Sequence, residues 1–457
     1  MTTDIAAEWA TPEILKELQS EFRGKIVREG EPGYDEARHI FNGMVDRRPA
    51  VFAQCAGTPD VIAAVRFARK HDVPFSIKAG GHNVAGNALV DRGLVIDLSP
   101  MRAVEVDAAT KTARVQGGAT WSDFDAATQA HGLASTGGLI STTGVAGLTL
   151  GGGLGWLMRK YGMSVDNLKS VEMVNAEGNL ITASESENSD LFWAMRGAGH
   201  NFGVVTTLEF RLHEVGTMLA GMVVYPIDQA KEVLRHYRDF TMSAPDEVIA
   251  QCALMHTPEG VRVCAVLMLY VGPAEQGEAA LRPLRTFGTP VADTVAPMPY
   301  TALQSMLDEG FPFGLQVYWK SEFLRELPDE AIDAVVAEYS KVISPLSVAL
   351  FEQFGGAVSR VDPHATAFGH RSAPYNLVII SRWEEGDAAP HIAWARSLWK
   401  AMQPYASGGI YVNYLGSDEQ ETVEAAYGDD FSRLATLKAK YDPENFFRVN
   451  QNVAPRG

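Results

Sequence analysis

The sequence predicts an α+β protein, because it contains two regions of different texture. Up to about residue 216, strand-like segments are short and closely spaced, and helical segments lie between them. From about residue 217, strand-like runs become longer and alternate with helical stretches. The first region lacks the regular strand–helix alternation of a doubly wound dinucleotide fold, so α+β is favoured over α/β.

The first region is expected to hold, in chain order, a helix at 58–70, strands at 74–79 and 94–98, a hairpin pair at 103–107 and 112–116, and a helix at 121–131. The first helix carries the clearest start signal. Thr58 is expected to cap it, and Pro59 takes the first helical position, where a missing N–H is tolerated. The two strands of the hairpin pair are short and close together along the chain, as antiparallel neighbours often are.

The second region reads as one sheet with helices on one face. Its six long strands are expected at 220–227, 247–257, 261–272, 315–324, 347–354 and 375–383, and its helices at 228–242, 274–286, 328–341 and 388–403. The last fifty residues return to polar turns and one helix at 431–441.

Composition narrows the class of protein. The 457 residues are 46% hydrophobic and 21% charged, which is typical of a globular protein with a full core. The net charge of −17 argues against nucleic acid or an anionic membrane as a partner. No apolar run approaches about 18 residues, and the N-terminus lacks the pattern of a signal peptide. We therefore expect a cytoplasmic protein with neither nucleic acid nor a membrane as a partner. A monomer or a homodimer is also expected.

Cysteine and histidine spacing gives no sign of a metal site. The three cysteines, Cys55, Cys252 and Cys264, form no CxxC pair and fit buried, reduced thiols. The histidines show neither HExxH nor another paired spacing, so we expect no metal.

Two glycine-rich stretches stand out. The stretch 76–88, SIKAGGHNVAGNA, places a histidine directly after two glycines, and 137–156 carries eight glycines among Ser141, Thr142 and Thr143. Loops of this kind expose consecutive backbone N–H groups that suit a pyrophosphate. Neither stretch matches the mononucleotide P-loop or the Rossmann fingerprint. Together with a third small-residue turn at 197–205, they favour a bound dinucleotide over simple sheet packing.

The motifs, taken in order, resemble a known family. The pieces TPDVIAAVRFAR, GGHNVAG, STTGVAGLTLGGGLGWLMRKYG, DNL, DLFWAMRGAGHNFGVVT, YVNY and YDPENFFRVNQN run along nearly the whole chain. This order is similar to that of bacterial berberine-bridge-enzyme-like FAD-linked oxidases, in the vanillyl-alcohol-oxidase flavoprotein superfamily.

The resemblance implies a two-part FAD-binding domain of the PCMH type and a central substrate domain with an antiparallel sheet backed by helices. On that basis residues 1–216 would form the FAD-binding domain and 217–405 the substrate domain. Residues 406–457 would return to the FAD-binding domain.

The resemblance also implies how FAD is held. His82 matches the family histidine that bonds covalently to the flavin, and histidine is an accepted nucleophile. Doubly linked relatives also use a cysteine, whose place is taken here by Ile140, so a single covalent link is expected. The residues expected to bind the cofactor are Lys78, Ala79, Gly80, Gly81, His82, Asn83, Gly86, Gly137, Ser141, Thr142, Thr143, Gly144, Gly147, Gly152, Gly203, Val205, Tyr411, Asn413 and Asn450.

The YVNY motif lies in a segment, 408–414, that is expected to be a strand. Alternation would place Tyr411 and Asn413 on one face and Val412 and Tyr414 on the other. Asn413 and Tyr414 could then both face the flavin only if the strand ended or bulged between them.

The resemblance makes Tyr414 the first candidate for the catalytic base. A tyrosine has an ordinary pKa near 10, so a base at neutral pH needs a cation or a strong hydrogen-bond network beside it. Lys320 is the expected cation, with Tyr318 on the same strand face, and Arg371 is a second candidate cation. If Tyr414 is not the base, the alternatives are Tyr318, Tyr411 or the central-sheet acid Glu352.

A flavin with a positioned base removes a hydride from a C–H next to oxygen or nitrogen. The expected activity is that of an oxidase that uses O₂ and releases H₂O₂, with a sugar, alcohol or secondary metabolite as substrate. Two alternatives stay open: a dehydrogenase with another acceptor, and a tailoring enzyme of polyketide or alkaloid type. Aromatic residues at 318, 319, 351 and 354 hint at a ring-shaped ligand, although they also fit a core.

Overall fold

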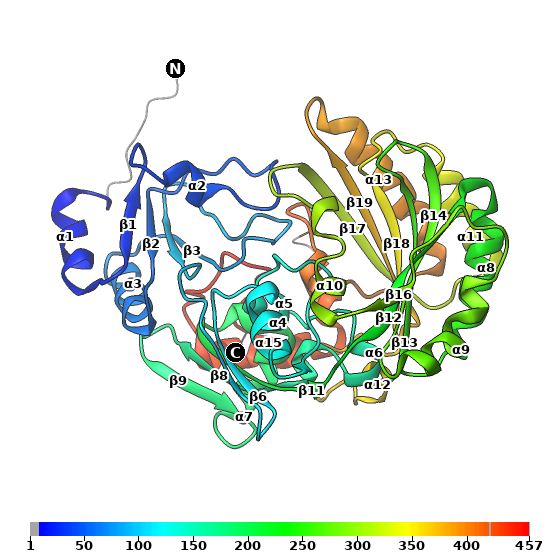
Figure 1. Ribbon diagram of the computed structural model, residues 1–457. Coiled ribbons are helices and arrows are strands. Elements are labelled where there is room, and N and C mark those ends of the chain that lie inside the picture. The colour runs from blue at the N-terminus through cyan, green and yellow to red at the C-terminus, as the bar shows by residue number, and fades with distance from the viewer. Residues whose placement is uncertain (1–8, 420–421, 457) are drawn as a thin grey trace.

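The computed structural model describes residues 9–419 and 422–456, and Figure 1 shows its arrangement. Three main sheets succeed one another across the view. A small sheet lies at the blue N-terminal end, a second lies below the centre, and the largest stands at the right with helices on its outer face. The red C-terminal segment lies beside the second sheet rather than beyond the large one.

The first sheet has the order β1-β2-β4-β3 and is partly parallel. Its strands are β1 (Lys25–Arg28), β2 (Val51–Gln54), β3 (Phe75–Lys78) and β4 (Leu94–Asp97), and its helices are α1 (Pro12–Glu21), α2 (Tyr34–Arg38) and α3 (Thr58–Lys70). β4 pairs in parallel with both β2 and β3. The 79–88 loop therefore leaves β3 at the carboxyl ends of these parallel strands, where ligands commonly bind in such sheets.

The second sheet has the order β5-β6-β10-β8-β9 and is antiparallel throughout. Its strands are β5 (Val104–Asp107), β6 (Thr112–Gln116), β8 (Leu168–Val174), β9 (Leu180–Ser184) and β10 (Val204–Arg211). The helices beside it are α4 (Trp121–Gln129), α5 (Val145–Leu150), α6 (Met158–Tyr161) and α7 (Ser189–Ala198), and a two-stranded pair joins β7 (Leu133–Ala134) to β11 (His213–Glu214).

The third sheet holds the six long strands expected from the sequence, with two short strands at its edge. The long strands are β12 (Met218–Pro226), β13 (Val248–His256), β14 (Arg262–Tyr270), β17 (Gln316–Leu324), β18 (Val348–Gln353) and β19 (Tyr375–Trp383), and the short ones are β15 (Ala292–Asp293) and β16 (Ala296–Met298). Four helices cover one face: α8 (Ala230–Thr241), α9 (Ala274–Arg285), α11 (Asp329–Tyr339) and α13 (Ala388–Met402). Short helices α10 (Tyr300–Gln304) and α12 (Ala357–Arg360) connect strands.

Both faces of the third sheet are buried, each in a different core. Residues such as Phe351, Leu377 and Ile379 pack under the four helices. Their neighbours Val378 and Ile380 belong to a core on the other face, shared with residues of the first region such as Trp156. Alternation along each strand therefore directs one set of side chains to the helices and the other set to the first region.

The C-terminal segment packs against the first region through α14 (Val423–Tyr427) and α15 (Phe431–Tyr441). The ammonium of Lys438, which is fully buried, donates to the carbonyl of Asn201 at 2.6 Å and to Asp442 at 2.6 Å. Asn450 donates to the carbonyl of His200 at 2.8 Å. The domain limits at 217 and 406 stay a prediction, since a packing contact does not define a boundary.

Most expected helices and strands are confirmed, with two corrections. The cap of α3 is Gly57 rather than Thr58, which is already the first helical residue. Residues 408–414 form no strand, because the chain turns through a short 3₁₀ helix at Val412–Tyr414. Among the described residues, no helix has the length and apolar character needed to cross a membrane.

One buried polar pair links α4 to α10. The Gln304 amide donates to one carboxyl oxygen of Asp125 at 2.9 Å, and both side chains are 1% exposed. The other oxygen of Asp125 and the carbonyl oxygen of Gln304 have no partner among the described residues. Burial raises the pKa of Asp125 to about 8. The protonated acid carries an O–H donor that the carboxylate lacks, and burial without a cation favours this neutral form.

We predict that Asp125→Asn flattens the pH dependence of stability. The folded pKa of Asp125 is raised, so its stabilising proton is fully bound below the unfolded pKa near 3.8 and is lost as pH rises through about 8. Between these values the wild-type unfolding free energy should fall by about 1.4 kcal/mol per pH unit on account of this proton. Thermal unfolding midpoints of wild type and Asp125→Asn at pH 5.5 and 7.5 test this. The prediction is contradicted if the midpoint changes by the same amount between the two pH values in both proteins.

Candidate functional site

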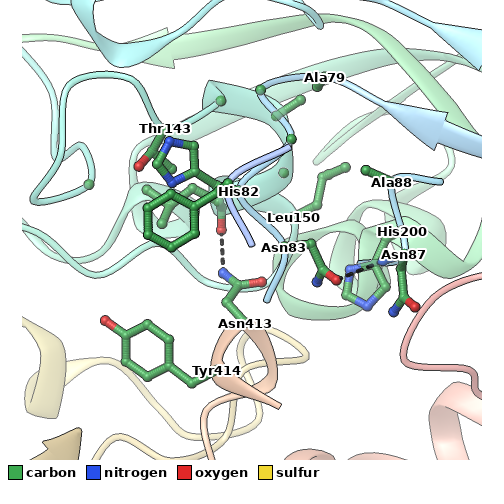
Figure 2. A pocket seen from close by; sticks show the side chains of 18 of the residues that line it. Ala79, His82, Asn83, Asn87, Ala88, Thr143, Leu150, His200, Asn413 and Tyr414 are labelled. Carbon is green, nitrogen blue, oxygen red and sulfur yellow. Dashed lines mark hydrogen bonds between the residues drawn. The ribbon is translucent and has the colours of Figure 1, made fainter. Parts of the chain in front are cut away.

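A cavity of about 270 Å³ is lined by both glycine-rich loops, the third sheet and the C-terminal segment. Figure 2 shows residues of the 79–88 loop and Thr143 on one side, with Asn413 and Tyr414 on another. Parts of the chain that are far apart in sequence therefore meet at one cavity. The structure brings together the following predicted cofactor residues at the cavity: Ala79, Gly80, Gly81, His82, Asn83, Thr143, Gly144, Gly147, Gly203, Val205, Asn413 and Asn450.

The 79–88 loop offers a row of free backbone donors. The N–H groups of residues 80–84 have no acceptor within the part of the chain that the structure describes. Gly81 has a φ of +71°, a conformation that glycine adopts without strain. Successive unpaired N–H groups in such a turn form a concave site for an anion, so this loop suits a phosphate without a lysine or arginine.

The second glycine loop packs directly on the first. A Cβ on Gly80 would lie 2.5 Å from the backbone nitrogen of Gly144, so neither position has room for a side chain. Gly147, three residues on, is different, because a Cβ there would meet nothing within 4 Å and would enter the cavity. The loops thus need glycine at Gly80 and Gly144 for packing, and Gly147 leaves space open.

His82 is held by two rings and one hydroxyl. Its imidazole stacks on Phe41 with centroids 4.6 Å apart and meets the edge of Phe313 at 5.0 Å. Nε2 lies 2.9 Å from the Thr142 hydroxyl. Burial lowers the pKa of His82 to about 4, so the ring is neutral at pH 7 and a nitrogen lone pair is available.

Three amide side chains at the cavity have buried polar atoms without a partner among the described residues. These atoms are Asn87 Nδ2, Asn450 Oδ1 and Gln451 Nε2. Buried amide atoms are normally hydrogen-bonded, so their lack of partners here indicates a polar ligand in the cavity. With the free N–H groups of the first loop, they match a large ligand that carries phosphate and several polar ring atoms.

Tyr414 reaches the cavity beside a buried acid. Its hydroxyl donates to Glu352 at 3.0 Å, and the Asn376 amide donates to the other carboxyl oxygen at 2.7 Å. Glu352 is 1% exposed, and burial raises its pKa to about 7. Burial and this carboxylate also raise the Tyr414 pKa well above 10. Tyr414 alone is therefore a poor base, while Glu352 gains or loses a proton near neutral pH.

The expected cations of Tyr414 are not beside it. Lys320 and Tyr318 lie on the helix-covered face of β17, whereas Trp319 between them lines the cavity. The Lys320 ammonium pairs with Glu419 at 2.6 Å, and the Tyr318 hydroxyl donates to Asp418 at 2.8 Å. The prediction that these two serve as catalytic residues at the cavity is wrong, because alternation turns them away.

Arg371 is also remote from Tyr414. It makes a two-pronged ion pair with Asp166 at 2.8 and 3.0 Å and donates to Thr366, with 1% of its surface exposed. It is a structural link between the two regions rather than a partner of the tyrosine.

The 3₁₀ turn at Val412–Tyr414 removes the conflict that alternation predicted for the YVNY motif. Asn413 and Tyr414 both line the cavity. Tyr411 lies outside the wall, where its hydroxyl accepts the Gly153 N–H at 2.9 Å and the Asn413 amide at 2.7 Å. Tyr411 therefore orients Asn413 instead of lining the cavity.

Six other predicted cofactor residues lie behind the wall: Lys78, Gly86, Gly137, Ser141, Thr142 and Gly152. Lys78 faces Asp97 at 3.5 Å, and Ser141 donates to Asp308 at 2.6 Å, so these residues brace the loops. Their contacts with a cofactor stay predictions.

Sequence reasoning missed most of the apolar wall and two polar groups: Phe41, Asn87, His200, Leu307, Phe311, Leu350, Val378 and Ile380. Leu350 and Glu352 are alternate residues of one strand, and this spacing was the available signal. Leu307 and Phe311 lie in a connection without regular pattern and gave none.

Comparison with known proteins agrees with this geometry. A family model described as an FAD binding domain matches residues 49–184, and one described as berberine and berberine like matches residues 410–454. The chain is 34% identical over 449 residues to an FAD-linked oxidoreductase of Dictyostelium discoideum, with 97% of each chain covered. It is 30% identical over 456 residues to (R)-6-hydroxynicotine oxidase of Paenarthrobacter nicotinovorans, with 95% and 97% covered.

Solved structures give the same result for the fold. 6-Hydroxy-D-nicotine oxidase from Arthrobacter nicotinovorans superposes with a TM-score of 0.88 at 29% identity, over 95% of this chain and 98% of that one. A chitooligosaccharide oxidase superposes with a TM-score of 0.88 at 25% identity, over 97% and 100%.

We predict that Gly147→Leu lowers the flavin content of the purified protein. The new side chain has room to fold but projects into the cavity, and overpacking of about 1–3 kcal/mol weakens binding about 5- to 150-fold. Flavin absorbance per protein, with thermal unfolding as a check on folding, measures the effect. Gly216→Leu is the matched control, because Gly216 is equally open and lies outside the cavity wall. A full flavin load in Gly147→Leu would refute the assignment.

Proposed function

The chain belongs to the berberine-bridge-enzyme-like family of FAD-linked oxidoreductases, and we propose that it is an oxidase of a small organic molecule with O₂ as electron acceptor. The observation that carries the proposal is the pairing of Tyr414 with Glu352 at the cavity that the glycine loops also line. FAD, when bound, supplies the acceptor for a hydride taken from a C–H next to oxygen or nitrogen. The relatives that are named oxidases favour O₂, and H₂O₂ released with substrate in air tests the acceptor.

The residues present fit FAD. The backbone donors of residues 80–84 suit its pyrophosphate, and the unpaired amide atoms of Asn87, Asn450 and Gln451 suit its polar ring edges. Cavity-lining glycines such as Gly147 leave room for its flat rings.

We assign proton transfer to Glu352 through the Tyr414 hydroxyl. The high pKa of Tyr414 disfavours a free phenolate, but a hydroxyl bonded to a carboxylate passes a substrate proton on as it accepts one. The Asn376 amide fixes the second oxygen of Glu352, which keeps the first aimed at Tyr414. Above pH 7 the carboxylate form predominates and can accept the proton.

We also propose that His82 is the single covalent attachment residue for FAD. Its neutral imidazole lines the cavity, and because Nε2 pairs with Thr142, Nδ1 is the nitrogen left for the bond. Ile140, which also lines the cavity, offers no second attachment.

Acid-precipitated wild-type protein should stay yellow, and a flavin peptide from it should contain His82. His82→Ala should give a colourless precipitate with free FAD in the supernatant. His200→Gln is the control, since His200 lines the same cavity with a similarly lowered pKa and should keep the colour. A colourless wild-type precipitate would end the covalent assignment.

Tyr414→Phe should slow flavin reduction by substrate about 10²- to 10⁴-fold while the ring packing and the flavin spectrum are kept. Anaerobic stopped-flow absorbance measures this rate, and a loss under about threefold would move the role away from Tyr414.

The pH dependence of flavin reduction distinguishes the role of Glu352 from that of Tyr414. In wild type the reduction rate should rise with pH through about 7, because the base must be deprotonated and the Glu352 pKa is raised to that value. Glu352→Gln should abolish this rise. Glu322→Gln changes a buried acid on the opposite face of the sheet, bonded to Gln403, and should keep it.

A further inference from the structure

The part of the cavity wall that comes from the third sheet and the connection before it is almost wholly apolar. We call it the sheet wall; its members are Leu307, Phe311, Trp319, Leu350, Val378, Ile380 and Glu352. Trp319 is paired with Ile380 across β17 and β19, and Leu350 with Val378 across β18 and β19, so the apolar side chains form one continuous surface. Among the described residues of this wall, Glu352 is the single side chain that can carry a charge.

The rings of this surface are fixed in place. Trp319 meets Tyr414 edge to face with centroids 5.2 Å apart, and the Arg382 guanidinium stacks behind Phe311 at 3.9 Å without lining the cavity. Fixed aromatic faces and branched aliphatic side chains favour a ligand that is itself apolar and ring-shaped.

The sheet wall offers few hydrogen-bond partners to the hydroxyls of a sugar. Its polar groups are the Glu352 carboxyl, the adjoining Tyr414 hydroxyl, and the indole N–H of Trp319, which has no partner among the described residues. A sugar ring carries more hydroxyls than these groups can satisfy. Each hydroxyl left without a partner weakens binding by about 5- to 150-fold, so a carbohydrate is a poor match.

The charged groups that line the cavity favour a positively charged ligand. Neither lysine nor arginine lines it within the described chain, and Glu352 is its only acidic residue. Glu352 is 1% exposed, and its hydrogen-bond partners among the described residues, the Tyr414 hydroxyl and the Asn376 amide, are both neutral. A buried carboxylate without a cation is unfavourable, and a ligand ammonium would compensate it, whereas an anionic ligand would be repelled.

We propose, building on the oxidase function above, that the substrate is an apolar, ring-bearing amine. It binds as the ammonium and passes one N–H proton by way of Tyr414 to Glu352. The C–H bond next to nitrogen then breaks, its electron pair leaves with hydrogen as hydride to the cofactor, and the nitrogen lone pair forms the C=N bond of an iminium product. FAD is the two-electron oxidant, and the carboxylate keeps the proton.

Benzylamine and benzyl alcohol, which have the same shape, test the proposal in the FAD-loaded enzyme. Dissociation constants come from perturbation of the flavin spectrum without O₂ at pH 8, above the Glu352 pKa of about 7. Benzylamine should bind about tenfold or more tightly than benzyl alcohol, and cellobiose and benzoate more weakly than either. Glu352→Gln should remove the preference for the amine, and Glu322→Gln should retain it.

Equal binding of benzylamine and benzyl alcohol, or tighter binding of cellobiose or benzoate, would overturn the amine proposal. So would an amine preference that survives in Glu352→Gln. The flavin content of the purified protein and its bleaching by dithionite report separately on the oxidase proposal. A protein that loads no flavin overturns that function, whereas a flavin-loaded protein without amine preference overturns only the substrate class.

Discussion

The close approach of two backbones, at Gly80 and Gly144, is the contact on which the site depends. With a Cβ on Gly80 only 2.5 Å from the nitrogen of Gly144, any side chain would push the loops apart. This contact brings the free N–H groups that follow Gly80 beside the open surface at Gly147. The lining of the cavity by two distant loops is thus a consequence of two missing side chains.

Side chains alternate between the two faces of the third sheet, so one face lines the cavity and the other packs against the helices. On β17, Trp319 lines the cavity while Lys320 pairs with Glu419 on the helix side. Here the sequence predicts that neighbours point to opposite faces, but both faces are buried, so hydrophobicity does not say which face meets the cavity. The choice follows from which side the helices cover, and tertiary packing decides that.

The fold was largely predictable because its elements carry local signals. The Pro59 helix start and the long apolar strands are examples. The two glycines before His82 drew attention to it, and the family resemblance supplied its expected role. From the sequence, Glu352 could be named only as an alternative to Tyr414 for the catalytic base. Its importance comes from contact with Tyr414, 62 residues away, and with Asn376 on the next strand. Such pairs depend on strand register and on a 3₁₀ turn, which no local pattern specifies.

The Tyr414–Glu352 hydrogen bond also joins parts of the chain that are far apart in the sequence. Tyr414 belongs to the C-terminal segment, which the buried Lys438 ammonium holds against the first region. Glu352 belongs to the third sheet. The two side chains therefore meet only when the tail has returned and the sheet is docked, so the proton transfer that we propose requires the fully assembled fold. The hydrogen bonds from Tyr414 and Asn376 lower the cost of burying the Glu352 carboxyl in an apolar wall, and the bond from Tyr414 exists only in the assembled fold.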